Sequence, residues 1–191
     1  MIDIMSVELV SHLHNLAGQE MTFESGQYLF RLGDKVRVVH FIEEGSVHLV
    51  RHQADGSALI LERAAPGSIL AEASLYSDAY YCDAIATART RTLALPKREI
   101  RARLATSPGF SEAWTKYLAH EVQRARLHAE ILSLKTVAER LDAWIAWRDV
   151  HVPEKGEWKL VAEQIGVSPE ALYRELAKRR RPKGDHSTLL L

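Results

Sequence analysis

Few residues in this chain combine a reactive type with a spacing that could do chemistry. Cys82 is the only cysteine, so no disulfide can form within the chain and a reducing cytoplasm is the location we expect. His12 and His14 form a His-x-His pair, but residues at i and i+2 of a helix point about 200° apart and cannot share a metal ion. We therefore expect no metal site.

The sequence patterns of the common enzyme classes are also missing. There is no triad order with a nucleophile elbow, no Walker-type glycine-rich loop and no His-Glu-x-x-His. The barrel enzymes called cupins use a His-x-His pair inside their barrel, whereas His12 precedes the β-rich part of this sequence. We expect a protein that is not an enzyme.

The charges are unevenly distributed, although the net charge is zero. Residues 1–100 hold 9 Lys and Arg against 13 Asp and Glu, and residues 101–191 hold 16 against 12. The extreme is the segment from Arg174 to Lys183, with six basic residues and one acid. A basic end favours a polyanionic partner, and a solvated helix end is the alternative.

The first half of the chain has the pattern of an all-β domain. Between about Met21 and Pro96, short apolar runs are separated by turn residues at roughly ten-residue spacing, which is typical of a sandwich or barrel. The pair Asp55-Gly56 is a strong hairpin signal, because a type I′ turn needs positive φ. We expect one helix over 7–16, and strands over 27–31, 38–43, 46–52, 58–63, 82–88 and 92–96.

After Pro96 the pattern becomes helical. We expect a short helix over 97–105 and, from the Ser107-Pro108 start signal, a long helix that breaks near 134–136 before a second one. Apolar residues recur along the long helix at steps of three and four: Trp114, Tyr117, Leu118, Val122, Ala125, Ala129 and Leu132. Such a stripe is typical of a dimer interface, and packing on the helix's own domain is the alternative.

Two shorter helices, over 157–165 and 171–180, carry the basic cluster. Between them Gly166 can turn the chain with positive φ, Ser168 can cap the second helix and Pro169 can take its first position. A helix, a glycine turn and a capped basic helix make the helix-turn-helix arrangement of DNA-binding proteins. A generic helical hairpin is the alternative.

The order of these segments resembles the cyclic AMP receptor protein and fumarate-nitrate regulator (Crp-Fnr) family of bacterial transcription factors, over residues 20–180. The segments that carry the resemblance are ESGQYLF at 24–30, IEEG at 42–45, PG at 66–67, AEASL at 71–75 and LVAEQIGVSPEALYR at 160–174. It implies an α+β chain: a jelly-roll-like β-roll effector domain over 1–106, a dimerisation helix over 107–135 and a helix-turn-helix domain over 136–191.

The resemblance also implies an effector pocket in the roll, lined by Glu72, Ala73, Ser74, Cys82, Asp83 and His120. Family members that bind a cyclic nucleotide hold its phosphate with an arginine, because a phosphate needs fixed donors and positive charge. Here Glu72 is kept, but Ala71 replaces a glycine, the arginine position falls on Cys82, and acidic Asp83 follows. No arginine lies nearby in the sequence before Arg89. We expect a pocket that does not bind a cyclic nucleotide.

Other effectors are left open. The cysteine cluster of the oxygen-sensing members is excluded within one chain, since four cysteines are needed for their iron–sulfur centre. Nine histidines allow haem, although no spacing singles out a ligand pair. A pocket between roll and long helix could be lined by Tyr80, Tyr81, Cys82, His120 and His128, and ordinary core or surface histidines are the simpler alternative.

In the second basic helix, the resemblance assigns base reading to Glu170 and Arg174, which lie four apart on one face. Glutamate accepts from the cytosine amine, and arginine binds guanine bidentately. Pro169 stands where the family has an arginine, which removes one guanine contact. Phosphate contacts are expected from Ser168, Tyr173, Lys178, Arg179 and Arg180. Only 181–191 stand in place of the family's β-hairpin wing, so we expect a shortened wing.

We expect a cytoplasmic, homodimeric regulator that binds a near-palindromic DNA site, with an unknown small-molecule effector. RNA polymerase is a further partner that the resemblance allows. No membrane association is expected, since no run of 18 apolar residues occurs. The alternative is a degenerate sensor module that no longer binds DNA and acts through protein partners.

Overall fold

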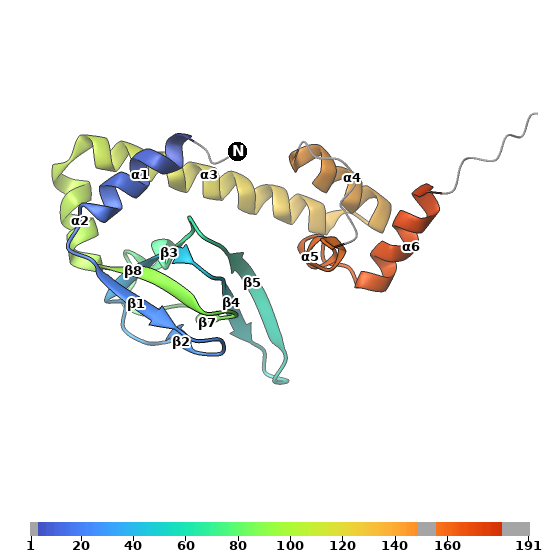
Figure 1. Ribbon diagram of the computed structural model, residues 1–191, viewed down its shortest axis with the longest axis horizontal. Coiled ribbons are helices and arrows are strands. Elements are labelled where there is room, and N and C mark those ends of the chain that lie inside the picture. The colour runs from blue at the N-terminus through green and yellow to red at the C-terminus, as the bar shows by residue number, and fades with distance from the viewer. Residues whose placement is uncertain (1–3, 149–155, 181–191) are drawn as a thin grey trace, which may run out of the picture. The chain divides into compact units, whose positions relative to one another are not determined.

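The computed structural model describes residues 4–148 and 156–180 (Figure 1). The chain forms two compact units, Met1–Leu118 and Ala119–Leu191. Helix α3, Pro108–Ser133, is continuous and contributes turns to both. The predicted domain boundaries at 106/107 and 135/136 stay predictions.

The first unit is an antiparallel sandwich of two four-stranded sheets, in the orders β1-β8-β3-β6 and β2-β7-β4-β5. The predicted α+β fold, with a β-roll followed by helices, is confirmed. The strands are β1 Gln19–Phe23, β2 Tyr28–Phe30, β3 Val38–Glu44, β4 Val47–His52, β5 Ala58–Ala64, β6 Ile69–Leu70, β7 Asp83–Ala86 and β8 Thr90–Pro96. A 3-10 turn, η1 (Glu72–Ser74), lies between β6 and β7.

Two strands and one turn differ from the expectation. The sequence pattern missed β1 and β6: β1 is largely exposed and begins with Gln19 and Glu20, and β6 has only two residues. The hairpin at Asp55-Gly56 forms, but its loop spans 53–57, and Gly56 alone of the pair has positive φ. The Asp55 carboxylate accepts from the Ser57 amide and hydroxyl, which stabilises this longer loop in place of a type I′ turn.

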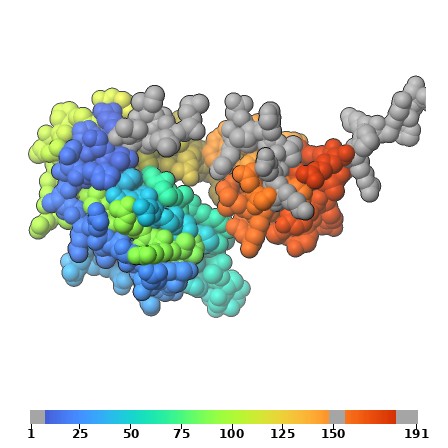
Figure 2. All heavy atoms as spheres, in the orientation of Figure 1, coloured from blue at the N-terminus to red at the C-terminus, as the bar shows by residue number. Residues whose placement is uncertain are grey.

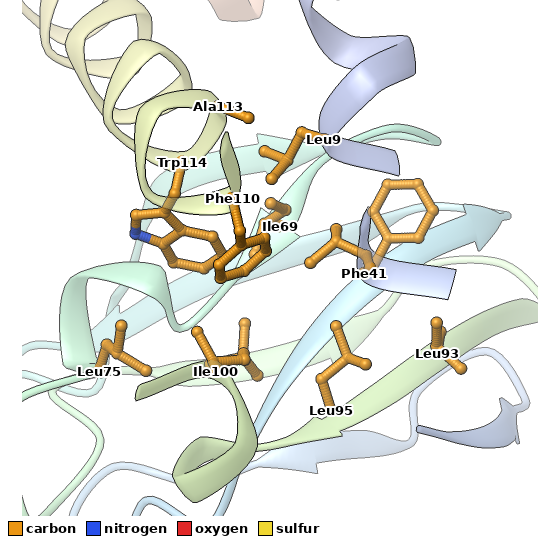
Figure 3. Packing of buried hydrophobic residues seen from close by; sticks show 12 residues of the cluster. Leu9, Phe41, Ile69, Leu75, Leu93, Leu95, Ile100, Phe110, Ala113 and Trp114 are labelled. Atoms are coloured by element: carbon orange, nitrogen blue, oxygen red, sulfur yellow. The ribbon is translucent and has the colours of Figure 1, made fainter. Parts of the chain in front are cut away.

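Helices cover one face of the β1-β8-β3-β6 sheet. α1 (Ile4–His14), α2 (Lys97–Thr106) and the first turns of α3 bring Leu9, Ile100, Phe110 and Trp114 onto apolar side chains of β3, β6 and β8 (Figure 3). Because side chains alternate along a strand, the other residues of β3 point between the two sheets. There they join a second buried cluster that includes Phe30, Ile42, Leu70, Tyr80 and Cys82.

The second unit is helical. It contains the last turns of α3 with α4 (Val137–Arg148), α5 (Trp158–Gln164) and α6 (Pro169–Arg180). Its core is apolar and consists of Ile131, Leu141, Trp144, Val161, Ala162, Ile165, Leu172 and Leu176. None of the described helices is both long and apolar enough to span a membrane.

His40 is a polar residue inside the sandwich. Its side chain is 1% exposed and stacks on Phe30, and its Nδ1 lies 3.1 Å from the Thr92 hydroxyl, whereas Nε2 has no hydrogen-bond partner among the described residues. Burial lowers the pKa of His40 from 6.5 to about 4, because the charged ring would lose its hydration. The ring is therefore neutral in the folded protein at neutral pH.

We predict that His40 makes the roll acid-labile. Between pH 6.5 and about 4 the unfolded chain binds a proton at this position and the folded chain does not, so the free energy of unfolding falls as the pH drops. The loss should reach about 3 kcal/mol. His40→Leu should flatten this part of the profile in urea titrations between pH 7 and 4, and His120→Leu, at an exposed helical site, should not. Parallel profiles for His40→Leu and the parent would contradict the prediction.

Candidate nucleic-acid interface and effector region

The predicted helix, glycine turn and capped helix are present at the predicted residues. α5 ends at Gln164, Gly166 has φ 65°, and α6 starts at Pro169. The Val167 amide donates to the Ala162 carbonyl, and the Ser168 hydroxyl accepts from the Ala171 amide at 3.2 Å. This is the N-cap interaction that a serine before a helix provides.

α6 lies at the surface of its unit (Figure 2) and has one buried and one open face. Leu172 and Leu176 are buried in the core, whereas Glu170, Arg174 and Lys178 are exposed. Because these three follow each other at intervals of four residues, they form a row along one side of the helix. Arg174 makes no hydrogen bond or ion pair to any of the described residues, so its guanidinium is available to a ligand.

Glu170 is held as a carboxylate. Its pKa is lowered, first by a hydrogen bond from its own backbone amide, then by one from the Ser168 hydroxyl, and finally by the charge of Arg174. An ionised glutamate is an acceptor only. The open face of α6 thus presents an acceptor, Glu170, next to a planar donor, Arg174.

The two arginines at the end of α6 have partners within the second unit. The Arg179 guanidinium pairs with Asp142 and Glu175 and donates to the Ala138 carbonyl at 3.1 Å, and so fastens α6 to α4. The Arg180 guanidinium lies 4.9 Å from the centre of the Trp158 ring, which also packs against Tyr173. Their predicted phosphate contacts stay predictions, and Arg179 would have to leave three partners to make one.

The turn after β6 keeps an unusual backbone conformation. Ala71 precedes η1 with φ 70°, and it is the only described residue other than glycine with positive φ. The resemblance places a glycine there, and glycine adopts this conformation without strain. Ala73 and Ser74 follow; Ser74 is buried, and its hydroxyl has no hydrogen-bond partner among the described residues.

Cys82, where the resemblance implies a phosphate-binding arginine, is part of the apolar interior. Its side chain is 1% exposed and belongs to the same cluster as Ala71 and Tyr80. Burial raises the pKa of the Cys82 thiol to about 11, so that it is a neutral thiol at physiological pH. Tyr80 stacks on Phe30 at 3.9 Å and donates to the Val38 carbonyl.

Asp83, the first residue of β7, points to the opposite side of the strand from Ala84, because neighbouring side chains alternate, and Ala84 shares the apolar cluster of Cys82. Its carboxylate accepts from the Leu32 amide at 2.8 Å and lies 3.1 Å from Nδ1 of His52. The effector role predicted for Asp83 stays a prediction, as do those of Glu72 and His120. His120 belongs to the second unit and is half-exposed, with Nδ1 4.0 Å from the Glu121 carboxylate.

Sequence reasoning missed a positive charge near Cys82. The Arg51 guanidinium donates to the Tyr81 carbonyl at 2.9 Å, and its charge acts to lower the pKa of Cys82, against the larger effect of burial. Arg51 comes from β4, whose residue Val50 pairs with Asp83. Arg51 could have been found by pairing the predicted strands in register. It could not be found by looking for an arginine close to Cys82 in the sequence.

The described residues contain no group of three or more His, Cys, Asp or Glu side chains that could hold a metal ion. His128, a candidate for the pocket wall, lies with Nε2 3.0 Å from the Gln164 carbonyl within the second unit. Tyr81 is exposed beside Arg51.

Comparison with known proteins agrees with this geometry. Residues 20–107 match the model of the cyclic nucleotide-binding domain family, and no curated protein matches the sequence. FixK2 from Bradyrhizobium japonicum is 17% identical with a TM-score of 0.68, covering 85% of this chain and 84% of that one. The c-di-GMP responsive global regulator CLP from Xanthomonas campestris is 18% identical with a TM-score of 0.62, covering 93% and 92%.

A third structure is a transcriptional regulator of the CRP family from Thermus thermophilus. It is 19% identical with a TM-score of 0.59, and the match covers 84% of each chain. At these identities the likeness concerns the fold. The chain therefore has the Crp-Fnr fold, with a domain of the cyclic nucleotide-binding type at residues 20–107.

Proposed function

We propose that this chain is a transcription regulator of the Crp-Fnr type that binds DNA as a homodimer. The observation that carries the proposal is the open face of α6, where Glu170, Arg174 and Lys178 form a row four residues apart. A recognition helix reads bases in the major groove with such a row. The fold shared with transcription regulators supports the same role.

Each side chain of the row suits a different part of DNA. Arg174 would bind the two acceptors of a guanine, and the Glu170 carboxylate would accept from a cytosine amine. Lys178, Tyr173 and Ser168 would contact the phosphates. Arg179 has a structural role in this proposal, since it holds α6 on α4.

The dimer would form along α3. The predicted apolar stripe divides: Trp114, Tyr117 and Leu118 pack into the core of the first unit, whereas other members of the stripe are exposed, namely Val122, Ala125, Ala129 and Leu132. Exposed apolar positions at steps of three and four are typical of a helix pair. The packing interpretation thus applies to the first part of the stripe, and the dimer interface is proposed for the second part.

The effector site would be a degenerate one. A buried neutral thiol at Cys82 cannot replace a phosphate-binding guanidinium, and Arg51 is engaged by the Tyr81 carbonyl. An effector other than a cyclic mononucleotide is therefore proposed. A transcription regulator of this type would act in the cytoplasm. RNA polymerase would be a further partner.

The DNA proposal predicts different effects for two changes that remove the same charge. Arg174→Ala should remove a bidentate base contact, cost roughly 1–3 kcal/mol and relax the preference at one base pair. Lys178→Ala should weaken binding to all sequences alike and reduce the salt dependence by about one counterion. Selection from a random DNA library would supply the near-palindromic site, and titrations at several salt concentrations would separate the effects. If no sequence is enriched, with or without host extract, a module that acts through protein partners takes the place of this proposal.

The dimer is tested by a charge on the exposed stripe. Val122→Glu should give a monomer, because a carboxylate from each chain would be desolvated at the interface at a cost of several kcal/mol. Gln123→Glu adds the same charge beside the stripe and should stay dimeric. Light scattering measures the mass of both, and a dimeric Val122→Glu variant would place the interface elsewhere.

The effector proposal predicts negligible binding of cyclic AMP and cyclic GMP at millimolar concentration in calorimetry. Cyclic di-GMP belongs in the same series, since the similar regulator CLP is described as responsive to it. Micromolar affinity for cyclic AMP would refute the degenerate site. Its loss in Arg51→Ala would then identify Arg51 as the phosphate ligand.

A further inference from the structure

Two helix ends meet in the second unit. α3 ends at Ser133 and α5 at Gln164, and the last carbonyl groups of a helix have no partners within it. Both ends also carry the negative pole of a helix dipole. Without a donor between them, these two ends would repel each other and leave the part-buried carbonyls of Leu134 and Ile165 unsatisfied.

The side chain of Arg140, on α4, lies between the two ends. Its Nε donates to the Leu134 carbonyl at 2.9 Å and its Nη2 to the Leu132 carbonyl at 2.9 Å. Its Nη1 donates to the carbonyls of Ile165 and Gly166 at 3.1 and 3.0 Å. Four of the five guanidinium N–H groups are thus given to backbone acceptors, two at each helix end.

The backbone at this point is packed too closely for a larger residue. A Cβ on Gly166 would lie 2.5 Å from Cδ2 of Leu132 and 3.4 Å from Nη1 of Arg140, and φ at Gly166 is 65°. The Gln164 carbonyl, two residues earlier, lies 3.0 Å from Nε2 of His128 on α3. Three consecutive residues of the turn are therefore fastened to α3 or to Arg140.

We propose that Arg140 is a positioning residue that sets the orientation of α5 and α6 against the last turns of α3. Hydrogen bonds are directional, so the four bonds fix an angle that the apolar core alone would not. A lysine could not replace the arginine, because its single nitrogen cannot span acceptors at two helix ends. Arg179 completes the connection, since it holds α6 on the same helix α4.

The positioning role of Arg140 has a consequence for DNA binding, which rests on the proposed function. A shift at the end of α3 is passed on to α6. Arg140 itself need not contact DNA. Its loss should therefore lower the preference for the selected site over random DNA by about tenfold or more. Binding to random DNA should change less than twofold, because the charges of α6 remain.

The orientation is measured directly by pulsed electron paramagnetic resonance in the full chain. Spin labels at Glu130→Cys and Ala177→Cys, both exposed positions, report the distance between α3 and α6, with labelled chains diluted in unlabelled protein. Cys82 is buried with a pKa of about 11, so it should escape labelling. A narrow distance distribution is expected for the parent and a broadened or shifted one for Arg140→Met.

Arg124→Met is the matched control, because Arg124 pairs with Glu121 on its own helix and its loss should leave the distribution unchanged. Arg140→Lys keeps the charge but lacks the planar guanidinium, and it should broaden the distance distribution as well. This second variant keeps the test valid if Arg140→Met does not fold. An unchanged distribution in a folded Arg140 variant would overturn the proposal. If no DNA sequence is selected while the distribution broadens, the DNA function fails and the positioning role stands.

Discussion

Carbonyl groups at two helix ends must be satisfied at one place in the second unit, and the arrangement of its helices depends on that requirement. A buried acceptor left without a donor costs about 1–3 kcal/mol. Of the four acceptors that converge where α3 and α5 end, the carbonyls of Leu134 and Ile165 are part-buried and those of Leu132 and Gly166 are exposed. The apolar core of this unit tolerates changes of angle, since hydrophobic contact is non-directional. The hydrogen bonds of the Arg140 guanidinium do not tolerate such changes. Gly166 lets the two helix ends approach closely enough for this guanidinium to reach both of them.

In the roll, the corresponding constraint is the alternation of side chains along paired strands. In β7 it puts Asp83 and Ala84 on opposite faces. Cys82 lies with Ala84 in the apolar interior, whereas Asp83 accepts from the Leu32 amide, so two neighbours that the sequence suggests as one site have different environments. The same alternation puts His40 between the sheets, next to Val39 and Phe41 that face the helices. At the position where the resemblance implies a phosphate-binding arginine, this chain thus has a side chain that packs in the core.

The sequence predicted the elements well where a pattern has a local cause. Glycines and prolines marked the turns, and Ser107-Pro108 and Ser168-Pro169 marked helix starts that the structure has at the same residues. β1 and β6 were missed because an exposed edge and a two-residue strand leave no periodic signal. Arg51 and the partners of Arg179 were missed because they depend on strand pairing and helix packing, which join residues distant in the chain.

Helix α3 shows how one segment can carry three surfaces. Its early turns give Phe110, Ala113 and Trp114 to the first core, and its last turns give Leu127 and Ile131 to the second. A helix with apolar residues on all sides is normally buried throughout, but these turns of α3 are only partly buried. The exposed apolar positions from Val122 to Leu132 are therefore those that neither core uses, on the part of the helix where the first core has ended. Most of this exposed stripe is the surface on which the proposed homodimer would form, whereas Leu132 at its end also lies against Gly166.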